Sequence, residues 1–195
     1  MKTILFASGN KGKQKEIQDI IKDFNLEIKV LSLKDMPNKI DEPIENGKTF
    51  SENAYIKAKY YYDNYKIPCI ADDSGLCIDY LKGYPGIYTA RFLGDVSQEI
   101  KNQGIIDILK DETSRNAHFT SAICFYDGKD AKYYEGIMPG KIDSQIRGTN
   151  GFGYDPIFIC DEYNINVGLL DSDKKNKISH RYKAMKKWVE SLEKE

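Results

Sequence analysis

The amino-acid sequence predicts an α/β fold, because short β-prone apolar runs alternate with segments whose apolar residues recur at helical spacing. The first run covers residues 3–7, and Ser8-Gly9-Asn10 follows it directly. Apolar residues then occur at i, i+3, i+4 and i+7 (positions 17, 20, 21 and 24), which is one face of a helix beginning near Lys11. A second strand is expected over 27–33. The chain thus begins strand, loop, helix, strand.

A charged loop and a second helix are expected next. Residues 34–48 contain two prolines and a glycine among many charges, which favours a loop. Thr49 and Glu52 have the spacing of a capping box. Small and aromatic residues follow at positions 54, 58, 61 and 65, so a helix is predicted here, with Asn53 and Lys57 one turn apart on an adjoining face.

The remaining elements follow the same logic. Residues 68–71 form a short apolar strand that is expected to end where Asp72-Asp73 begins. Asp127-Gly128 is a typical hairpin turn. The patterns then predict a helix over 100–109, a hairpin of strands 119–126 and 132–138, a strand over 157–160 and a last helix from about 179.

Length and charge limit the classes of function. A chain of 195 residues suggests one domain, residues 1–195, with a core of its own. The net charge of −1 argues against broad binding to nucleic acid or anionic membranes. The four cysteines form no Cys-x-x-Cys pair, so buried free thiols are expected. The first apolar run is too short for a signal segment or a membrane span, which favours a cytoplasmic protein.

A glycine-lysine motif lies between the first strand and helix. It comprises Ser8, Gly9, Asn10, Lys11, Gly12 and Lys13. Backbone N–H groups at a helix N-terminus attract anions, and lysines add charge, so this motif suits a di- or triphosphate. It lacks the spacing of a Walker A loop. The alternative is a simple turn with solvated lysines.

An acidic pair and a separate glutamate are candidate metal ligands. Asp72-Asp73 follows an apolar strand and precedes Ser74-Gly75. Successive strand residues point in opposite directions, so the two carboxylates should play different roles: one meets a metal or water, and nearby donors hold the other. Glu45 is a second candidate ligand for a hard divalent cation. The alternatives are two acidic turn residues, a capping Glu52 and a solvated Lys57.

Two C-terminal motifs are candidates for binding a base. Residues 151–156 (GFGYDP) combine a tight glycine loop with aromatic rings that offer a stacking face. His180 and Arg181 begin the last helix, where their charge opposes the helix dipole, and this inconsistency indicates a function. Their donors suit a 6-keto oxygen and would face a 6-amino group donor to donor. The alternatives are a structural turn and surface basic residues.

Together these segments resemble the inosine triphosphate pyrophosphatase family, the non-canonical purine NTP pyrophosphatases. The likeness runs nearly end to end, and the order and spacing of the motifs are specific. The motifs are SGNKGK (8–13), ENGKTFSENAYIKA (45–58), ADDSGLCIDYLKGYPGIYTARFLG (71–94), RGTNGFGYDPIF (147–158) and KNKISHR (175–181).

This resemblance implies a two-lobed α/β fold with a long mixed twisted sheet flanked by helices, and an active site in the cleft between lobes. It also implies a homodimer and Mg²⁺-dependent hydrolysis of ITP, dITP and XTP to the monophosphate and pyrophosphate. The site residues it implies are Ser8–Lys13 for the phosphates, Asp73 as proton acceptor and metal ligand, Glu45 as metal ligand, Ser74, Phe152, Gly153, Tyr154, Asp155 and Lys175 at the nucleotide, and His180 and Arg181 at the base.

One position departs from the family pattern. The family usually has an Ala-Glu-Leu-like stretch after the FGYDPIF strand, and Gly168-Leu169-Leu170 stands here, so Leu169 replaces the acidic residue. The contribution of that loop is therefore open. Two other interpretations remain: a septum-formation-type pyrophosphatase that acts on modified pyrimidine nucleotides, which His180-Arg181 disfavours, and a nucleotide-binding protein without hydrolysis.

Overall fold

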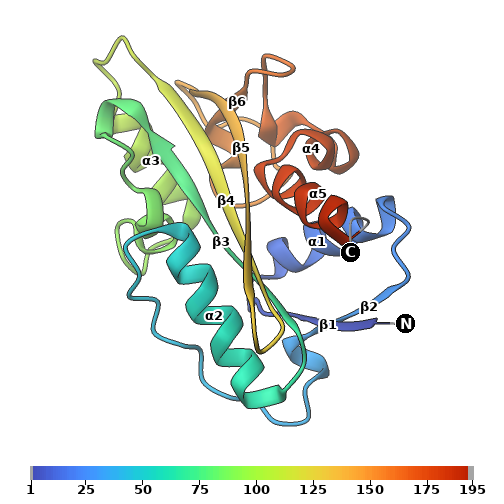
Figure 1. The fold of residues 1–195 in the computed structure, drawn as a ribbon. Helices are drawn as coiled ribbons and strands as arrows, with labels where there is room; N and C mark the ends of the chain where they lie inside the picture. Colours follow the sequence, from blue (N-terminus) through green and yellow to red (C-terminus); the bar gives the residue numbers. More distant parts are fainter. Residues whose placement is uncertain (1, 193–195) are drawn as a thin grey trace. The chain divides into compact units, whose positions relative to one another are not determined.

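The computed structural model describes residues 2–192 and contains a seven-stranded mixed sheet flanked by helices (Figure 1). The strand order is β2-β1-β3-β4-β5-β6-β7, with β1 parallel to β2 and β3, and β6 antiparallel to β5 and β7. This architecture confirms the predicted α/β class. The strands are β1 (Lys2–Phe6), β2 (Ile28–Ser32), β3 (Cys69–Ile78), β4 (Asn116–Tyr126), β5 (Ala131–Ile142), β6 (Phe158–Cys160) and β7 (Ile165–Asn166), and the helices are α1 (Lys11–Asp23), α2 (Phe50–Tyr65), α3 (Gln98–Ile108), α4 (Ser172–Ile178) and α5 (His180–Leu192).

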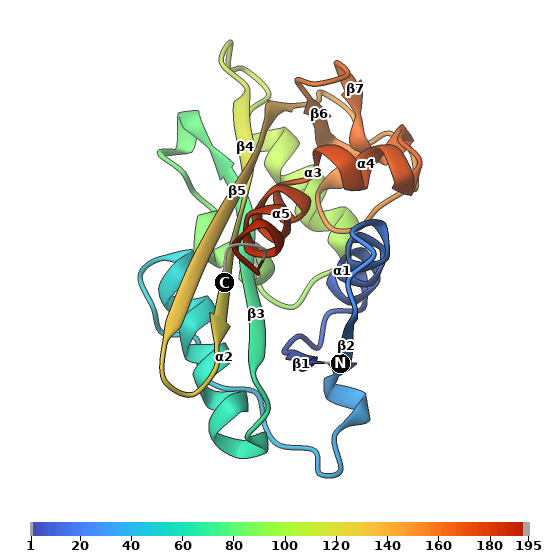
Figure 2. The same cartoon turned by 45° about the vertical axis from the view of Figure 1, so that its right-hand side comes forward.

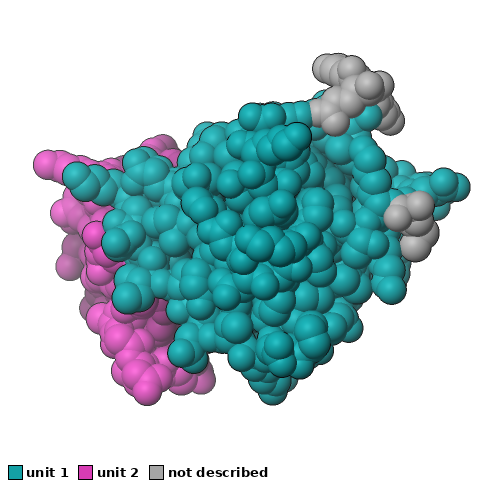
Figure 3. All heavy atoms as spheres, turned by 60° about the horizontal axis from the view of Figure 1, so that its bottom comes forward, with its two compact units in different colours: residues 1–73, 121–136, 181–195 teal, residues 74–120, 137–180 magenta. Residues whose placement is uncertain are grey.

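The described chain groups into two compact units, which Figure 3 colours separately. Unit 1 contains the residues up to 73, residues 121–136 and the residues from 181 onward. Unit 2 contains residues 74–120 and 137–180. Strands β3, β4 and β5 contribute residues to both units, so neither unit is a continuous piece of the chain.

Unit 1 has a helical layer on each face of its strands (Figures 1 and 2). Strand β1 and the residue after it show why: Ile4 and Phe6 pack into one apolar cluster with residues of α1 and α5, while Leu5 and Ala7 pack into a second cluster with residues of α2. Alternate strand residues point to opposite faces, so one apolar strand supplies both cores. Trp188 on α5 is fully buried in the first cluster.

Unit 2 is built around one apolar cluster, which draws on α3, α4, the strands of this unit and the short helical turns between them. Phe119 and Phe158 contact each other there, with ring centroids 4.6 Å apart. No helix within residues 2–192 is long and apolar enough to cross a membrane. All four cysteines are free and buried, which confirms the expectation of buried free thiols.

Local signals determine where the helices begin. Asn10 caps α1, its side-chain oxygen accepting from Lys13 N at 3.1 Å. Thr49 caps α2 and accepts from Glu52 N at 3.1 Å. The Glu52 carboxylate in turn accepts from Lys48 N at 2.6 Å, one residue before the position that a capping box uses. The predicted start of α2 is confirmed.

The prediction that the third strand ends at Asp72 is wrong. Strand β3 continues through Asp72 and Asp73 to Ile78, and nearly all of it is buried. The acidic pair therefore lies inside a strand, because the flanking elements supply partners for both carboxylates. Helix α4 and the short strand β7 were not predicted, since each is too short to show a clear period.

Candidate active site

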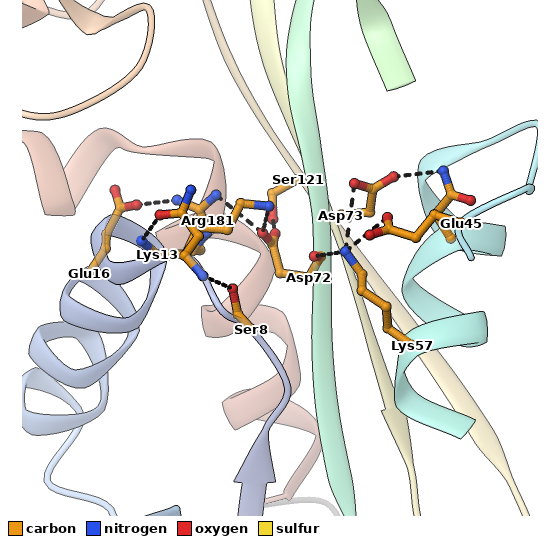
Figure 4. A network of polar contacts seen from close by, with 11 residues as sticks. Ser8, Lys13, Glu16, Glu45, Lys57, Asp72, Asp73, Ser121 and Arg181 are labelled. Carbon is orange, nitrogen blue, oxygen red and sulfur yellow. Dashed lines mark hydrogen bonds and ion pairs between the residues drawn. The ribbon is translucent and has the colours of Figure 1, made fainter. Parts of the chain in front are cut away.

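Asp72 and Asp73 lie on opposite faces of β3, as the alternation of strand side chains requires (Figure 4). Asp72 faces Lys13 and Arg181, whereas Asp73 faces Lys57 and Glu45. Their exposures are 1% and 8%. The two carboxylates thus lie in different surroundings within unit 1, and the division of roles between them stays a prediction.

Asp72 is the centre of a buried ionic network. Its Oδ2 atom lies 2.7 Å from Lys13 Nζ and 3.2 Å from Arg181 NH2, and its Oδ1 accepts from Ser121 Oγ at 2.5 Å. Arg181 also donates through NH1 to the buried carboxylate of Glu16. Two carboxylates therefore face two basic groups, which offsets the cost of burying each charge.

This network sets the ionisation of its members. Burial alone would raise the pKa of Asp72, but the charges of Arg181 and Lys13 outweigh it and hold that pKa well below its ordinary value. Burial lowers the pKa of Lys13, against the raising effect of Asp72. Asp72 is therefore held as a permanent carboxylate by its basic neighbours, and it is unsuited to accept a proton.

Asp73 lies in a second cluster on the α2 side of the sheet. Asn53 Nδ2 donates to Asp73 Oδ2 at 3.0 Å. Lys57 Nζ donates to the backbone oxygen of Asp72 at 2.8 Å and lies 3.1 Å from Glu45 Oε2 and 3.8 Å from Asp73 Oδ1. The loop over residues 34–48 thus brings Glu45 close to the Asp73 carboxylate, although 28 positions separate them.

The environment of Asp73 suits a proton acceptor. Burial raises its pKa, against the lowering effects of Lys57, Lys13 and the hydrogen bond from Asn53. A carboxylate with a raised pKa binds a proton more readily than an ordinary aspartate near neutral pH. Of the two acidic residues on β3, Asp73 is therefore the one whose surroundings match general-base chemistry.

The Glu45–Asp73 pair fits a magnesium ion. Both carboxylates contact the same ammonium group, that of Lys57, which shows that their oxygens converge on a cationic position. Mg²⁺ usually takes one or two protein carboxylates together with waters and substrate phosphates. The described residues contain no cluster of three or more His, Cys, Asp or Glu side chains arranged for a metal.

Unit 2 carries a polar cluster of its own, at the loop over residues 151–156, which we call the glycine-aromatic loop. Lys175 Nζ lies 2.6 Å from Asp155 Oδ2 and 4.5 Å from the centre of the Phe152 ring. Asp155 Oδ2 also accepts from Phe152 N at 2.8 Å. Gly151 has φ +75°, and a side chain there would overlap the Asp155 carboxylate. The loop therefore holds an aromatic ring, a carboxylate and an ammonium group together.

A residue before this loop and the last residue of the loop are hydrogen-bonded to Asn166 of β7. Asn166 Nδ2 donates to Asp143 Oδ2 at 2.9 Å and to Pro156 O at 3.0 Å, while Arg147 Nε donates to Asp143 Oδ2 at 3.1 Å. Leu169, the departure from the family pattern, is 56% exposed. The loop is held by these polar contacts, and none of them involves the Leu169 side chain.

The sequence pattern of the Ham1 family matches residues 4–191, nearly the whole chain. The chain belongs to the Ham1 family. It is 38% identical to a dITP/XTP pyrophosphatase of Aquifex aeolicus over 200 residues, covering 97% of this chain and 96% of the relative. It is 43% identical to a dITP/XTP pyrophosphatase of Desulfotalea psychrophila over 184 residues, covering 93% of this chain and 81% of the relative. These relatives confirm the resemblance.

Solved structures of Ham1 proteins share the fold. The Ham1 protein of Staphylococcus aureus matches with a TM-score of 0.86 at 34% identity, covering 98% of each chain. A HAM1 protein of Coxiella burnetii matches with a TM-score of 0.89 at 33% identity, covering 100% of each chain. The likeness in structure thus spans the same residues as the likeness in sequence.

The glycine-lysine motif of this Ham1 chain forms the junction of β1 and α1. Ser8 Oγ accepts from Asn10 N at 3.2 Å, and the Asn10 side chain caps the helix. Gly9 and Lys11 are exposed and Gly12 is half-buried. The Lys13 side chain, in contrast, pairs with Asp72 and is 15% exposed. The motif is a capped helix N-terminus with its second lysine in an ion pair. Phosphate binding there stays a prediction.

His180 and Arg181 are buried in this Ham1 chain, with exposures of 5% and 1%. The His180 ring stacks on Phe119 at 5.1 Å, and Arg181 lies between Glu16 and Asp72. The idea of surface basic residues is therefore wrong. The charge of Arg181 at the start of α5 is compensated by two carboxylates, which explains the apparent conflict with the helix dipole. A contact with a base stays a prediction.

The remaining predicted site residues are Ser74 on β3 and Gly153 and Tyr154 in the glycine-aromatic loop. Ser74 is half-buried on β3, directly after Asp73. Gly153 O accepts from Asn102 Nδ2 at 3.2 Å, and Tyr154 OH donates to Thr89 O at 2.9 Å. Both contacts hold the glycine-aromatic loop to the rest of unit 2.

Sequence reasoning missed Glu16 and Ser121, and it named Asn53 and Lys57 near Glu45 without assigning them to the site. The favoured interpretation of Lys57 as solvated is wrong, since its side chain is 13% exposed and contacts both acidic groups. The sequence signal for Asn53 and Lys57 is their spacing of one helical turn, on the helix that follows Glu45. Glu16 and Ser121 carried none, since only the fold brings them to Asp72.

Proposed function

We propose that this chain hydrolyses non-canonical purine nucleoside triphosphates such as ITP, dITP and XTP to the monophosphate and pyrophosphate, in the cytoplasm and as a homodimer. Membership of the Ham1 family and its likeness to dITP/XTP pyrophosphatases support the substrate class. The observation that carries the chemistry is the division of the acidic pair. Asp72 is locked in a buried ionic network, and Asp73 lies beside Glu45 and Lys57.

In this proposal Asp73 is the catalytic base. It accepts a proton from a water molecule whose oxygen forms a bond to the α-phosphorus, while the bond from that phosphorus to the bridging oxygen breaks and pyrophosphate leaves. Lys57 holds the two carboxylates close and adds positive charge where the polyphosphate is expected.

Glu45 and Asp73 would hold Mg²⁺. When bound, the ion supplies positive charge that neutralises phosphate oxygens and favours departure of pyrophosphate. The glycine-lysine motif, residues 8–13, supplies backbone N–H groups and lysine charge for the phosphates. Phe152, Asp155 and Lys175 are assigned to the nucleotide, and Ser74, His180 and Arg181 keep their predicted contacts with the substrate and its base.

The proposal is tested with a panel of nucleoside triphosphates, assayed for pyrophosphate with and without Mg²⁺. ITP, dITP and XTP should be cleaved in the presence of Mg²⁺, whereas ATP should be a weak substrate. Cleavage confined to modified pyrimidine nucleotides would favour the septum-formation-type activity. Tight binding of ITP without pyrophosphate release would favour a nucleotide-binding protein. Asp73→Asn should abolish most turnover and leave nucleotide binding intact, and near-normal turnover would refute its role as base.

A further inference from the structure

We propose that Asn53 is a positioning residue for this reaction, whose amide fixes the orientation of the Asp73 carboxylate and ties it to the loop that carries Glu45. The inference rests on the proposed function, because it assigns Asn53 to the same site. It adds a residue that holds the base in place and does not itself touch the reacting atoms.

Both ends of the Asn53 amide are engaged. Nδ2 donates to Asp73 Oδ2 at 3.0 Å, and Oδ1 accepts from Gly47 N at 2.8 Å. Only the nitrogen can donate to a carboxylate and only the oxygen can accept from a backbone N–H, so the amide has one favourable orientation. Asn53 is 1% exposed. Water therefore cannot readily replace either hydrogen-bond partner, and losing one of them would leave a buried polar group unsatisfied.

The backbone around Asn53 is fixed as well. Asn53 lies in the first turn of α2, where its own N–H donates to Thr49 O at 3.1 Å. Gly47 approaches so closely that a Cβ atom there would come within 2.7 Å of Asn53 Oδ1 and 2.8 Å of Glu52 Cβ. The loop before α2 thus contacts this amide directly through Gly47, which is two residues after Glu45.

The consequence for Asp73 is a carboxylate held at both oxygens. Asn53 binds Oδ2, and Lys57 Nζ lies 3.8 Å from Oδ1. The terminal torsion of an aspartate is broad and roughly two-fold, so a carboxylate without such contacts samples other orientations. Misplacing a reacting group by about 1 Å can lower the rate by roughly 100-fold. Loss of the Asn53 contact should therefore lower turnover more than substrate binding.

The test compares Asn53→Ala and Asn53→Asp with the wild-type protein. Asn53→Asp keeps nearly the same shape and an acceptor for Gly47 N, but its ionised carboxylate has no donor for Asp73 and adds a like charge beside it. Asn53→Ala removes both contacts. Asn64→Ala is the matched control, because Asn64 is an exposed asparagine of the same helix whose Nδ2 donates to Tyr60 O. Each protein is assayed for kcat and KM with ITP and Mg²⁺.

The measurements include a readout other than activity. Calorimetry gives the Kd of the Mg²⁺ complex of the non-hydrolysable inosine 5′-(α,β-imido)triphosphate, and circular dichroism confirms the fold. We expect kcat to fall about 10- to 100-fold in both Asn53 variants, as for a misplaced reacting group, while KM and Kd change by less than about three-fold. Asn64→Ala should match the wild-type protein in all three quantities.

Several results would overturn the inference. A wild-type kcat in Asn53→Asp would show that only the Gly47 contact matters. A raised KM with unchanged kcat would assign Asn53 to substrate binding, and unfolding of both variants would assign it to stability alone. These outcomes differ from failure of the proposed function, in which the wild-type protein itself releases no pyrophosphate from ITP.

Discussion

Replacing Arg181 by methionine is expected to destabilise this protein strongly, although the two side chains have similar lengths. The guanidinium is 1% exposed and contacts the carboxylates of Glu16 and Asp72, which are themselves buried. The variant removes the positive charge and leaves both carboxylates in the interior. Lys13 still pairs with Asp72 at 2.7 Å, so part of the network remains in the variant.

The magnitude follows from the burial of the network. Removing one partner of a buried ion pair costs roughly 3–5 kcal/mol, because the other charge is left without compensation. With an m-value of about 2 kcal/mol per M in urea, this loss lowers the unfolding midpoint by roughly 1.5–2.5 M. Since the free energy of unfolding of most domains is about 5–15 kcal/mol, this loss would remove between about a fifth and all of it.

The assay is urea unfolding at pH 7 and at a series of lower values down to about pH 2, followed by circular dichroism. The pKa of Asp72 is held below its ordinary value in the folded wild-type protein, so this contribution to stability is present above about pH 4, the unfolded pKa, and is lost as pH falls further. The variant lacks much of that contribution. The difference in unfolding free energy between the two proteins should therefore be largest near pH 7 and shrink at acid pH.

The control is Lys186→Met, which removes an exposed partner 3.9 Å from Glu190 on the same helix. A surface change of this kind should alter the unfolding free energy by at most about 0.5 kcal/mol. A loss below about 1 kcal/mol in Arg181→Met, or one equal to that of the control, would refute the reasoning. It would mean that the buried network contributes little net stability.

Three further predictions concern the core, the loop and the thiols. Trp188→Ala should lower the unfolding free energy by roughly 3–5 kcal/mol in urea unfolding, since the side chain is fully buried, and a loss below about 1 kcal/mol would contradict the packing. Gly148→Ala should raise the KM for ITP, because Gly148 has φ +71° and a side chain there overlaps the Gly168 carbonyl; an unchanged KM would argue against a role of this loop in binding. Burial raises the pKa of Cys124 to about 12 and also raises that of Cys69, so a thiol reagent at pH 8 should label them only as fast as the protein unfolds, whereas rapid native labelling would contradict their burial.

The order of local elements was predictable because the signals are local. Asn10 and Thr49 cap their helices through contacts with residues three positions away, and Asp127-Gly128 joins the predicted hairpin. The α/β class follows from the alternation of these elements. Helix α4 and strand β7 escaped prediction because seven and two residues give too little of a period.

The candidate site was predictable in part. The sequence identified Asp72, Asp73 and Glu45, and the two-residue period of a strand predicted that the acidic pair would divide its roles. It did not reveal that β3 continues through the pair. A strand covered on both faces carries charged residues only where other elements provide partners, and those partners come from distant parts of the chain.

By itself, the sequence determined the local elements, the family and the motifs of this Ham1 chain. Only the tertiary structure decided which acidic residue is locked away and which is presented, because that choice depends on partners such as Arg181 and Glu16, 165 positions apart. Periodicity and capping act over a few residues, whereas the ionisation of a buried carboxylate depends on every charge within a few ångströms, whatever its place in the chain. The surroundings of Asp72 and Asp73 are therefore properties of the fold.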